Sequence, residues 1–149
     1  MTQSTTRGIR PGLRLGRKRD RGEGGQAVLE FAMILPLILL LIFGLVDFGR
    51  AYYTWLVVTN AAREGARVGA TQQPLAAINT RIYDTAAGLD ADELTISVTN
   101  VQGPRGEAIE VDLEYNFVFV TPIGNIMEVI GGENLSSPNI SGHASMRLE

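Results

Sequence analysis

The sequence contains no cysteine and only one histidine, His143, among its 149 residues. The lack of cysteine excludes a disulfide framework and thiolate metal sites. Familiar catalytic motifs are missing too, since the chain has no G-x-S-x-G elbow, no P-loop and no H-E-x-x-H pair. The sequence therefore predicts a protein that is not an enzyme and that holds no cofactor or metal.

Charge is distributed unevenly along the chain. Residues 1–25 carry seven Lys or Arg against two Asp or Glu, a net charge of +5. Residues 26–149 carry six against fourteen, a net charge of −8. Such a basic block can bind nucleic acid, but this one directly precedes an apolar run, which favours the cytoplasmic flank of a membrane segment. We therefore expect residues 1–25 to be a disordered cytoplasmic leader and nucleic acid not to be a partner.

The apolar run from Phe31 to Val46 contains sixteen residues without a charge. With Ala27–Leu29 and Phe48 it approaches the roughly 20 residues that cross a bilayer. Eight of the ten residues 34–43 are Ile or Leu, which leaves no polar face and argues against a soluble core helix. A cleaved signal peptide would need a small-residue site after the run. Aromatic residues typical of a membrane interface follow instead: Phe48, Tyr52, Tyr53 and Trp55.

The helical pattern continues past the apolar run, and we expect one helix over residues 26–70. Asp47 with Arg50, and Glu64 with Arg67, form i,i+3 pairs expected on an exposed helix surface. Three small residues, Ala61, Gly65 and Gly69, share one helical face. Such a face permits either close packing with another helix, giving a homo- or hetero-oligomer through the N-terminal helix, or packing of the protein's own domain.

Residues 71–149 show the patterns of a small α+β domain. A helix is expected over 75–89, and alternating apolar residues predict strands over 94–101, 107–120 and 139–149. Residues 123–132 fit a short helix or a loop. The predicted fold is a membrane-anchored, pilin-like α+β protein. Its long N-terminal helix and second helix cover a three-stranded antiparallel sheet, with Leu56, Val57 and Ala61 in the cover.

Glu30 is a carboxylate at the head of the apolar run, five residues after Gly25. Charges near the membrane are costly and are usually partnered or functional. No Lys or Arg lies within one helical turn of Glu30. Cleavage after Gly25 would create an amine on Gln26 that could pair with Glu30. Alternatively, Glu30 lies at headgroup depth and complements the helix dipole.

The segments GQAVLEFAMILPLILLLIFGLVDFGRAYY and VVTNAAREGARVGA resemble the TadE-like proteins of the tight-adherence (Flp-type) pilus system. The ending EYNFVFVTPIG…ISGHASMRLE is also similar to that family's C-terminal domain. The resemblance implies cleavage by a prepilin peptidase between Gly25 and Gln26, with Glu30 as the acidic residue five positions after the cut.

The resemblance further implies a pseudopilin, a minor pilin or assembly component of a Tad pilus and secretion apparatus. Its partners would be membrane lipid, other pilins or Tad assembly proteins, and the peptidase. It implies a single-pass protein of the bacterial inner membrane, with a cytoplasmic N-terminus and the C-terminal domain outside or in an extracellular pilus. The alternative is an uncleaved membrane anchor whose outer domain binds a partner.

Overall fold

The computed structural model describes residues 21–131 and 137–149. The chain divides after Pro36 into two compact units, residues 1–36 and 37–149. The first unit, described from Arg21 onward, consists of helix alone. The helix α1 (Arg21–Ala70) passes through both units and has 50 residues. Within the described ranges it is the one helix long and apolar enough to cross a membrane.

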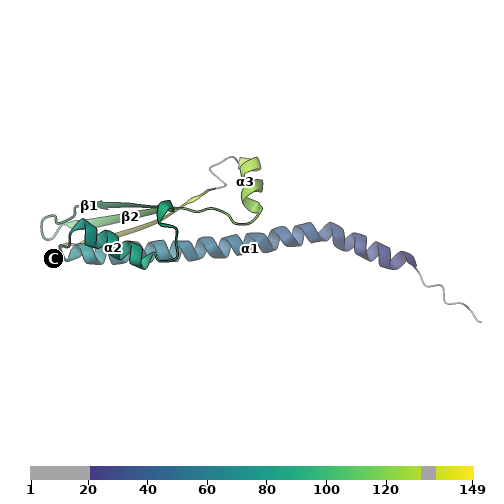
Figure 1. Ribbon diagram of the computed structural model, residues 1–149, viewed down its shortest axis with the longest axis horizontal. Coiled ribbons are helices and arrows are strands. Elements are labelled where there is room, and N and C mark those ends of the chain that lie inside the picture. The colour runs from purple at the N-terminus through teal and green to yellow at the C-terminus, as the bar shows by residue number, and fades with distance from the viewer. Residues whose placement is uncertain (1–20, 132–136) are drawn as a thin grey trace, which may run out of the picture. The chain divides into compact units, whose positions relative to one another are not determined.

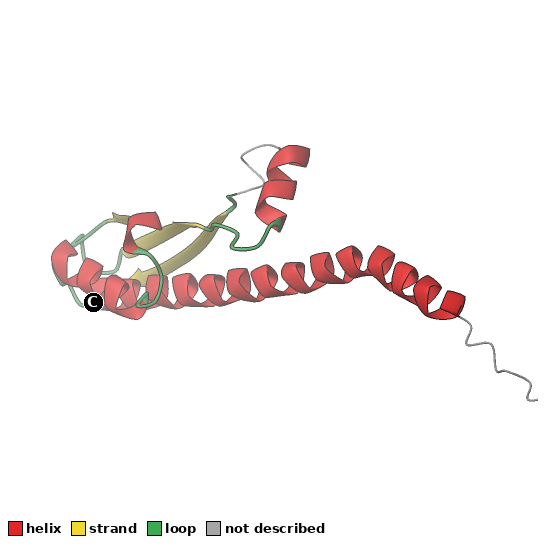
Figure 2. Ribbon diagram, turned by 45° about the vertical axis from the view of Figure 1, so that its right-hand side comes forward, coloured by secondary structure: helices red, strands yellow, loops and turns green. Residues whose placement is uncertain are grey.

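The second unit contains an α+β domain built on the end of α1 (Figure 1). After α1 come α2 (Leu75–Thr85), a 3₁₀ turn η1 (Ala91–Glu93) and β1 (Leu94–Thr99). The chain continues through β2 (Ala108–Asn116), α3 (Ile123–Gly131) and β3 (Asn139–Arg147). The strands form one antiparallel sheet in the order β1-β2-β3, coloured yellow in Figure 2.

The core lies between the inner face of the sheet, the outer part of α1, and α2. Alternation along β2 turns Ile109, Val111 and Leu113 inward, and all three are fully buried. The core also contains residues of both helices: Val58, Ala61, Ala62 and Ala66 of α1, and Ile78 and Ile82 of α2. Small residues on α1 allow the neighbouring elements to approach its backbone closely.

Gly142 of β3 lies close against the backbone of α1. A Cβ at this position would lie 2.9 Å from the carbonyl oxygen of Val58 and 3.0 Å from the amide nitrogen of Thr59. Both are backbone atoms of a helix, which cannot rotate away as a flexible side chain would. Only glycine therefore lets β3 lie this close to α1.

The fold class predicted from the sequence is confirmed: a long apolar N-terminal helix, further helices and a three-stranded antiparallel sheet. Several boundaries differ. The second helix ends at Thr85 rather than 89, and the predicted strand 107–120 is shorter because residues after Asn116 leave the sheet for α1. The segment that fits either a short helix or a loop contains the helix α3, over residues 123–131.

Two expectations about α1 also differ from the structure. Leu56 is 39% exposed and lies outside the cover, whereas Ala61 is fully buried and Val57 packs against the core as expected, together with Val58. The expected leader 1–25 falls mainly on residues outside the described ranges, but residues 21–25 are already helical. Helix propagation adds a hydrogen bond for each residue fixed, which offsets the cost of about 1 kcal/mol for each glycine in this turn.

Candidate functional site

The proposed processing residues lie in the first turns of α1, within the first unit. Gln26 and Glu30 face solvent one helical turn apart. The Gln26 side-chain nitrogen Nε2 donates a hydrogen bond of 3.0 Å to Glu30 Oε1. Gln26 is thus already placed against the carboxylate that was expected to need a partner.

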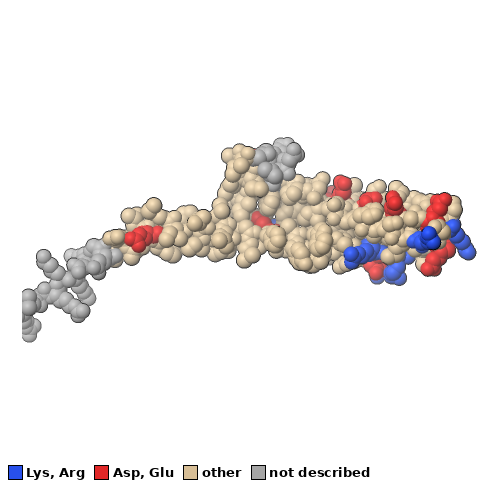
Figure 3. Space-filling view, turned by 180° about the vertical axis from the view of Figure 1, so that it is seen from behind, with Lys and Arg blue, Asp and Glu red and all other residues tan. Residues whose placement is uncertain are grey.

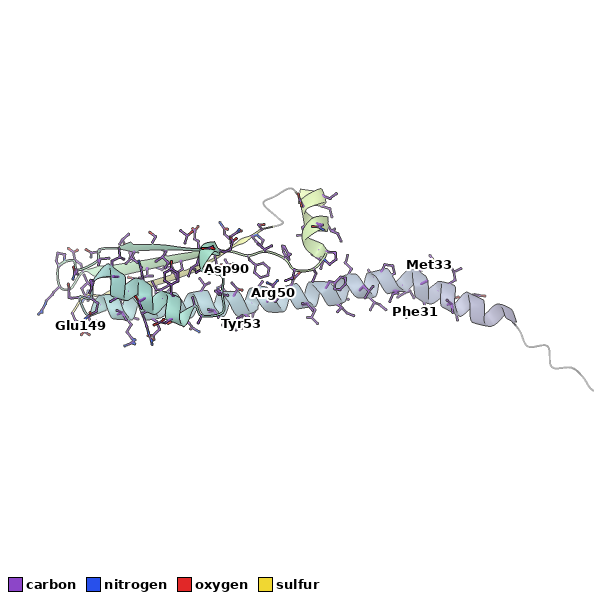
Figure 4. The ribbon with its side chains drawn as sticks, in the orientation of Figure 1. Phe31, Met33, Arg50, Tyr53, Asp90 and Glu149 are labelled. Atoms are coloured by element: carbon purple, nitrogen blue, oxygen red, sulfur yellow. The ribbon has the colours of Figure 1, made fainter. Side chains whose placement is uncertain are left out.

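Glycines at the head of α1 leave open space around the Gly25–Gln26 peptide bond. A Cβ added to Gly24 or to Gly25 would meet no atom within 4 Å. Beyond this bond, Phe31 and Met33 project from the helix surface (Figure 4), with 58% and 75% of their areas exposed. Exposed residues thus flank the Gly25–Gln26 bond within the helix, and an apolar surface for lipid or other helices follows them.

The small-residue face of α1 is covered by the protein's own domain. Ala61 is fully buried. A Cβ on Gly65 would lie 2.7 Å from Ile82 Cγ1 of α2, and one on Gly69 would overlap Ile109 Cδ1 of β2. Of the two uses expected for this face, the structure shows packing within the chain. Helix–helix contact through Ala61, Gly65 and Gly69 would require the domain to move away.

Asp47 lies just beyond the apolar run and is the most buried carboxylate among the described residues, with 1% of its area exposed. Its Oδ1 accepts hydrogen bonds from the Val120 amide at 3.2 Å and from Arg50 Nη1 at 3.3 Å. Its Oδ2 accepts from the Thr121 amide at 3.3 Å and from the Thr121 hydroxyl. We call Asp47, Arg50, Val120 and Thr121 the Asp47 cluster; it joins α1 to the segment before α3.

The prediction of an exposed Asp47–Arg50 pair is wrong in one respect, because contacts with Val120 and Thr121, 73 and 74 residues further along the chain, bury the carboxylate. The ion pair itself exists, at 3.3 Å. Arg50 Nη1 also donates to the Val118 carbonyl at 3.2 Å, and the guanidinium carbon lies 5.1 Å from the centre of the Phe117 ring. A single arginine thus contacts two successive residues of the segment that follows β2, as well as Asp47 on its own helix.

A pocket of about 340 Å³ lies beside the Asp47 cluster, between α1, the α2–β1 connection and the end of β2. Arg50 and Tyr53 of α1 and Asp90 lie around it (Figure 4). Glu93, also in its lining, accepts a 2.7 Å hydrogen bond from the Asn116 side-chain nitrogen. The lining combines aromatic, cationic and anionic groups. Within residues 21–131 and 137–149, no cluster of three or more His, Asp or Glu could hold a metal.

On the face that Figure 3 shows, charged side chains gather over α2, the sheet and the end of α1, and few lie on the apolar part of α1. Glu64 accepts hydrogen bonds from Arg67 at 2.8 Å and from Arg81 of α2 at 3.2 Å. These two arginines, Arg67 first, hold the pKa of the Glu64 carboxyl below its usual value. The Glu64–Arg67 pair was expected from sequence, whereas Arg81 arrives only through the fold.

His143, the single histidine, lies on the solvent face of the sheet. It faces Asp112 across the β2–β3 register, with Nδ1 2.7 Å from Asp112 Oδ1. Both side chains are more than half exposed. The alternation of β3 accounts for this exposed position, whereas the partner Asp112 comes from the pairing of β3 with β2.

Three features together are informative about the family of this chain. They are an exposed Gly-Gln-x-x-x-Glu sequence at the start of α1, the apolar run after it, and the continuation of the helix into a small α+β domain. Residues 25–67 match the family model of the TadE-like proteins. This segment is TadE-like. No curated protein and no solved structure matches the chain. The TadE-like match begins at Gly25 and ends within the part of α1 that forms the domain core.

The TadE-like match and the apolar helix together indicate a membrane-anchored protein involved in Tad pilus assembly. The match covers Gly25, Gln26, Glu30 and Asp47. Asp47 is the residue whose role the sequence did not reveal. Its signal was present, since a carboxylate at the end of an apolar run needs partners, but the partners come from residues 120 and 121.

Proposed function

We propose that this protein is a pseudopilin, acting as a minor pilin or assembly component of a Tad/Flp-type pilus and secretion apparatus. Its role is structural rather than catalytic. The observation that carries the proposal is the TadE-like match beginning at Gly25, where Gln26 and Glu30 occupy the exposed head of an apolar helix. The proposed partners are membrane lipid, other pilins or Tad assembly proteins, and a prepilin peptidase.

Processing would give the Gln26–Glu30 pair its function. Cleavage between Gly25 and Gln26 removes the basic leader and leaves a positively charged α-amino group on Gln26. This group joins an amide that already donates to the Glu30 carboxylate at 3.0 Å. A charge-assisted contact of this kind offsets the cost of bringing Glu30 into an apolar assembly. The pair can form within one chain or with Glu30 of a neighbouring helix.

The proposed location is the bacterial inner membrane, with the N-terminus in the cytoplasm. Its support is the net charge of +5 on residues 1–25, which directly precede the apolar run. The domain formed by residues 71–149 and the end of α1 would then lie outside the cytoplasm. From there the subunit could enter an extracellular fibre or remain at its base.

The alternative is an uncleaved single-pass anchor whose outer domain binds a partner. Two observations favour it. The Gly25–Gln26 bond lies within α1, so a peptidase must unwind helix before cutting. The domain also carries the mixed polar and aromatic pocket of about 340 Å³.

Mass spectrometry of the full chain, expressed with and without an active prepilin peptidase, separates these two functions. A mature protein beginning at Gln26 is expected only with the peptidase. Gly25→Ala should abolish the cut, and Gly24→Ala is the matched control, because both positions tolerate a Cβ without any contact. An intact leader in the presence of active peptidase would exclude the pseudopilin mechanism and leave the anchor.

Glu30 is tested by assembly rather than by processing. Glu30→Leu should still insert into the membrane but should lose cross-links to other pilus components, while Glu30→Gln should retain part of them. Equal assembly by Glu30→Leu and the wild type would mean that Glu30 acts only at the helix terminus.

A further inference from the structure

The short helix α3 presents an apolar stripe that the rest of the described chain does not cover. Val129 and Ile130 are 88% and 76% exposed, and Ile126 is 39% exposed. Their i, i+3, i+4 spacing puts them on one side of the helix, while Glu128 lies on the opposite side and Asn125, one turn before Val129, lies at the edge of the stripe. A helix with one apolar face needs a surface on which to bury it.

The position of α3 along α1 is fixed at the end of the apolar run. A Cβ placed on Gly44 would lie 3.5 Å from Ile123 Cδ1, an ordinary van der Waals contact, so the first residue of α3 lies against α1 there. The Asp47 cluster holds Val120 and Thr121 one turn further along. Both ribbon views show α3 running across the direction of α1 rather than alongside it (Figures 1 and 2).

This level is also where the membrane boundary falls along α1. The uncharged run ends at Val46, and Phe48 and Tyr52 follow it with 71% and 54% of their areas exposed. Aromatic side chains of this kind mark the headgroup region of a bilayer. Phe48 lies about 6 Å beyond Gly44 along the helix axis. The start of α3 therefore lies at the boundary between acyl chains and headgroups.

We propose that α3 lies in the plane of the membrane interface as a second lipid contact of the chain. Val129 and Ile130 enter the acyl region, and Glu128 faces the headgroups and water. The lipid at this contact is continuous with the lipid around the exposed apolar run of α1, because Ile123 at the start of α3 lies against that run. Because α3 carries Glu128 and no Lys or Arg, the contact forms on zwitterionic as well as anionic lipid.

This contact orients the outer domain. A single membrane-crossing helix lets the domain rotate and tilt, whereas a helix lying in the interface holds one side of the domain at the bilayer. The inference rests on α1 crossing the membrane, and it holds whether or not Gly25–Gln26 is cut.

The test uses single cysteines in the full chain, which has none of its own. Nitroxide labels at Val129→Cys and Ile130→Cys report depth in phosphatidylcholine vesicles from their relative accessibility to oxygen and to a water-soluble nickel chelate. Glu128→Cys on the opposite face of α3 is the matched control. Ile38→Cys in the apolar run and Ser97→Cys on the sheet supply the lipid and water references.

The expected result is an oxygen-to-nickel accessibility ratio several-fold higher at positions 129 and 130 than at 128, unchanged when anionic lipid is added. A ratio at 129 and 130 equal to that at 97, with 38 still deep, would overturn the proposal while leaving the anchor intact. Protection at 129 and 130 that disappears when the protein is diluted in lipid would overturn it too, because a second copy would then be the cover. A water-exposed label at 38 would refute the membrane anchor itself.

Discussion

Replacing Asp47 should release the segment before α3 from α1. The carboxylate accepts from the Val120 and Thr121 amides, the Thr121 hydroxyl and Arg50. Hydrogen bonds to a charged group contribute about 1.5–3 kcal/mol each. Val120 is 68% exposed and the Arg50 side chain 46%, so water satisfies part of what is lost. We therefore expect Asp47→Ala to weaken this attachment by only about 2–3 kcal/mol.

The assay is amide hydrogen exchange of the full chain in lipid nanodiscs, read at residues 120 and 121. A loss of that size corresponds to exchange about 30- to 150-fold faster, if local opening controls it. Asp47→Asn should give a smaller effect, because its Oδ1 can still accept while its Nδ2 now faces donors. Glu64→Ala is the control, since it removes a carboxylate from the same helix without touching this segment.

The decisive comparison is a double-mutant cycle between Asp47→Ala and Thr121→Ala. Direct contact predicts that the two effects are strongly non-additive. Additive effects, or unchanged exchange at 120 and 121 in Asp47→Ala, would refute the role of the Asp47 cluster in holding the segment.

Two further predictions concern the domain itself. Gly142→Ala places a Cβ 2.9 Å from the Val58 carbonyl oxygen and should destabilise the domain by about 1–3 kcal/mol, measured by denaturant unfolding in detergent. Gly49→Ala, whose Cβ meets nothing within 4 Å, should be neutral or stabilising, and equal losses in both variants would contradict the packing argument. The lowered pKa of Glu64, outside the apolar run, means that its contribution to folding is fully present above its unfolded-state pKa. That contribution is lost as the pH falls through the lower folded value. The melting-temperature difference between wild type and Glu64→Gln should thus be largest near neutral pH and disappear in strong acid, and a difference independent of pH would contradict this assignment.

Local patterns were enough to predict most of the fold. The uncharged run, the aromatic residues after it and the alternation in three segments each reflect a period of one secondary structure. The TadE-like residues at the head of α1 could likewise be read directly, because Gly25, Gln26 and Glu30 lie within six positions of one another. Strand ends were harder to place, since residues 117–120 are apolar, β-favouring residues that still fit a strand pattern after they leave the sheet.

The small-residue face of α1 shows what local sequence patterns do not determine. Ala61, Gly65 and Gly69 permit close packing of any partner, and their spacing does not identify which. The structure fills that face with Ile78, Ile82 and Ile109 from the same chain. Steric fit with residues distant in sequence therefore determines which partner packs on this face.

The sequence by itself determined that the chain has an apolar helix of membrane-spanning length, a basic segment before it and a sheet with one apolar face. These follow from composition and period, which are properties of neighbouring residues. Only the tertiary structure decided that Asp47 is buried, that α2 and β2 cover the small face, and that α3 begins beside Gly44. Each of these joins residues from different elements, because burial of a carboxylate or a glycine depends on what the fold brings against it.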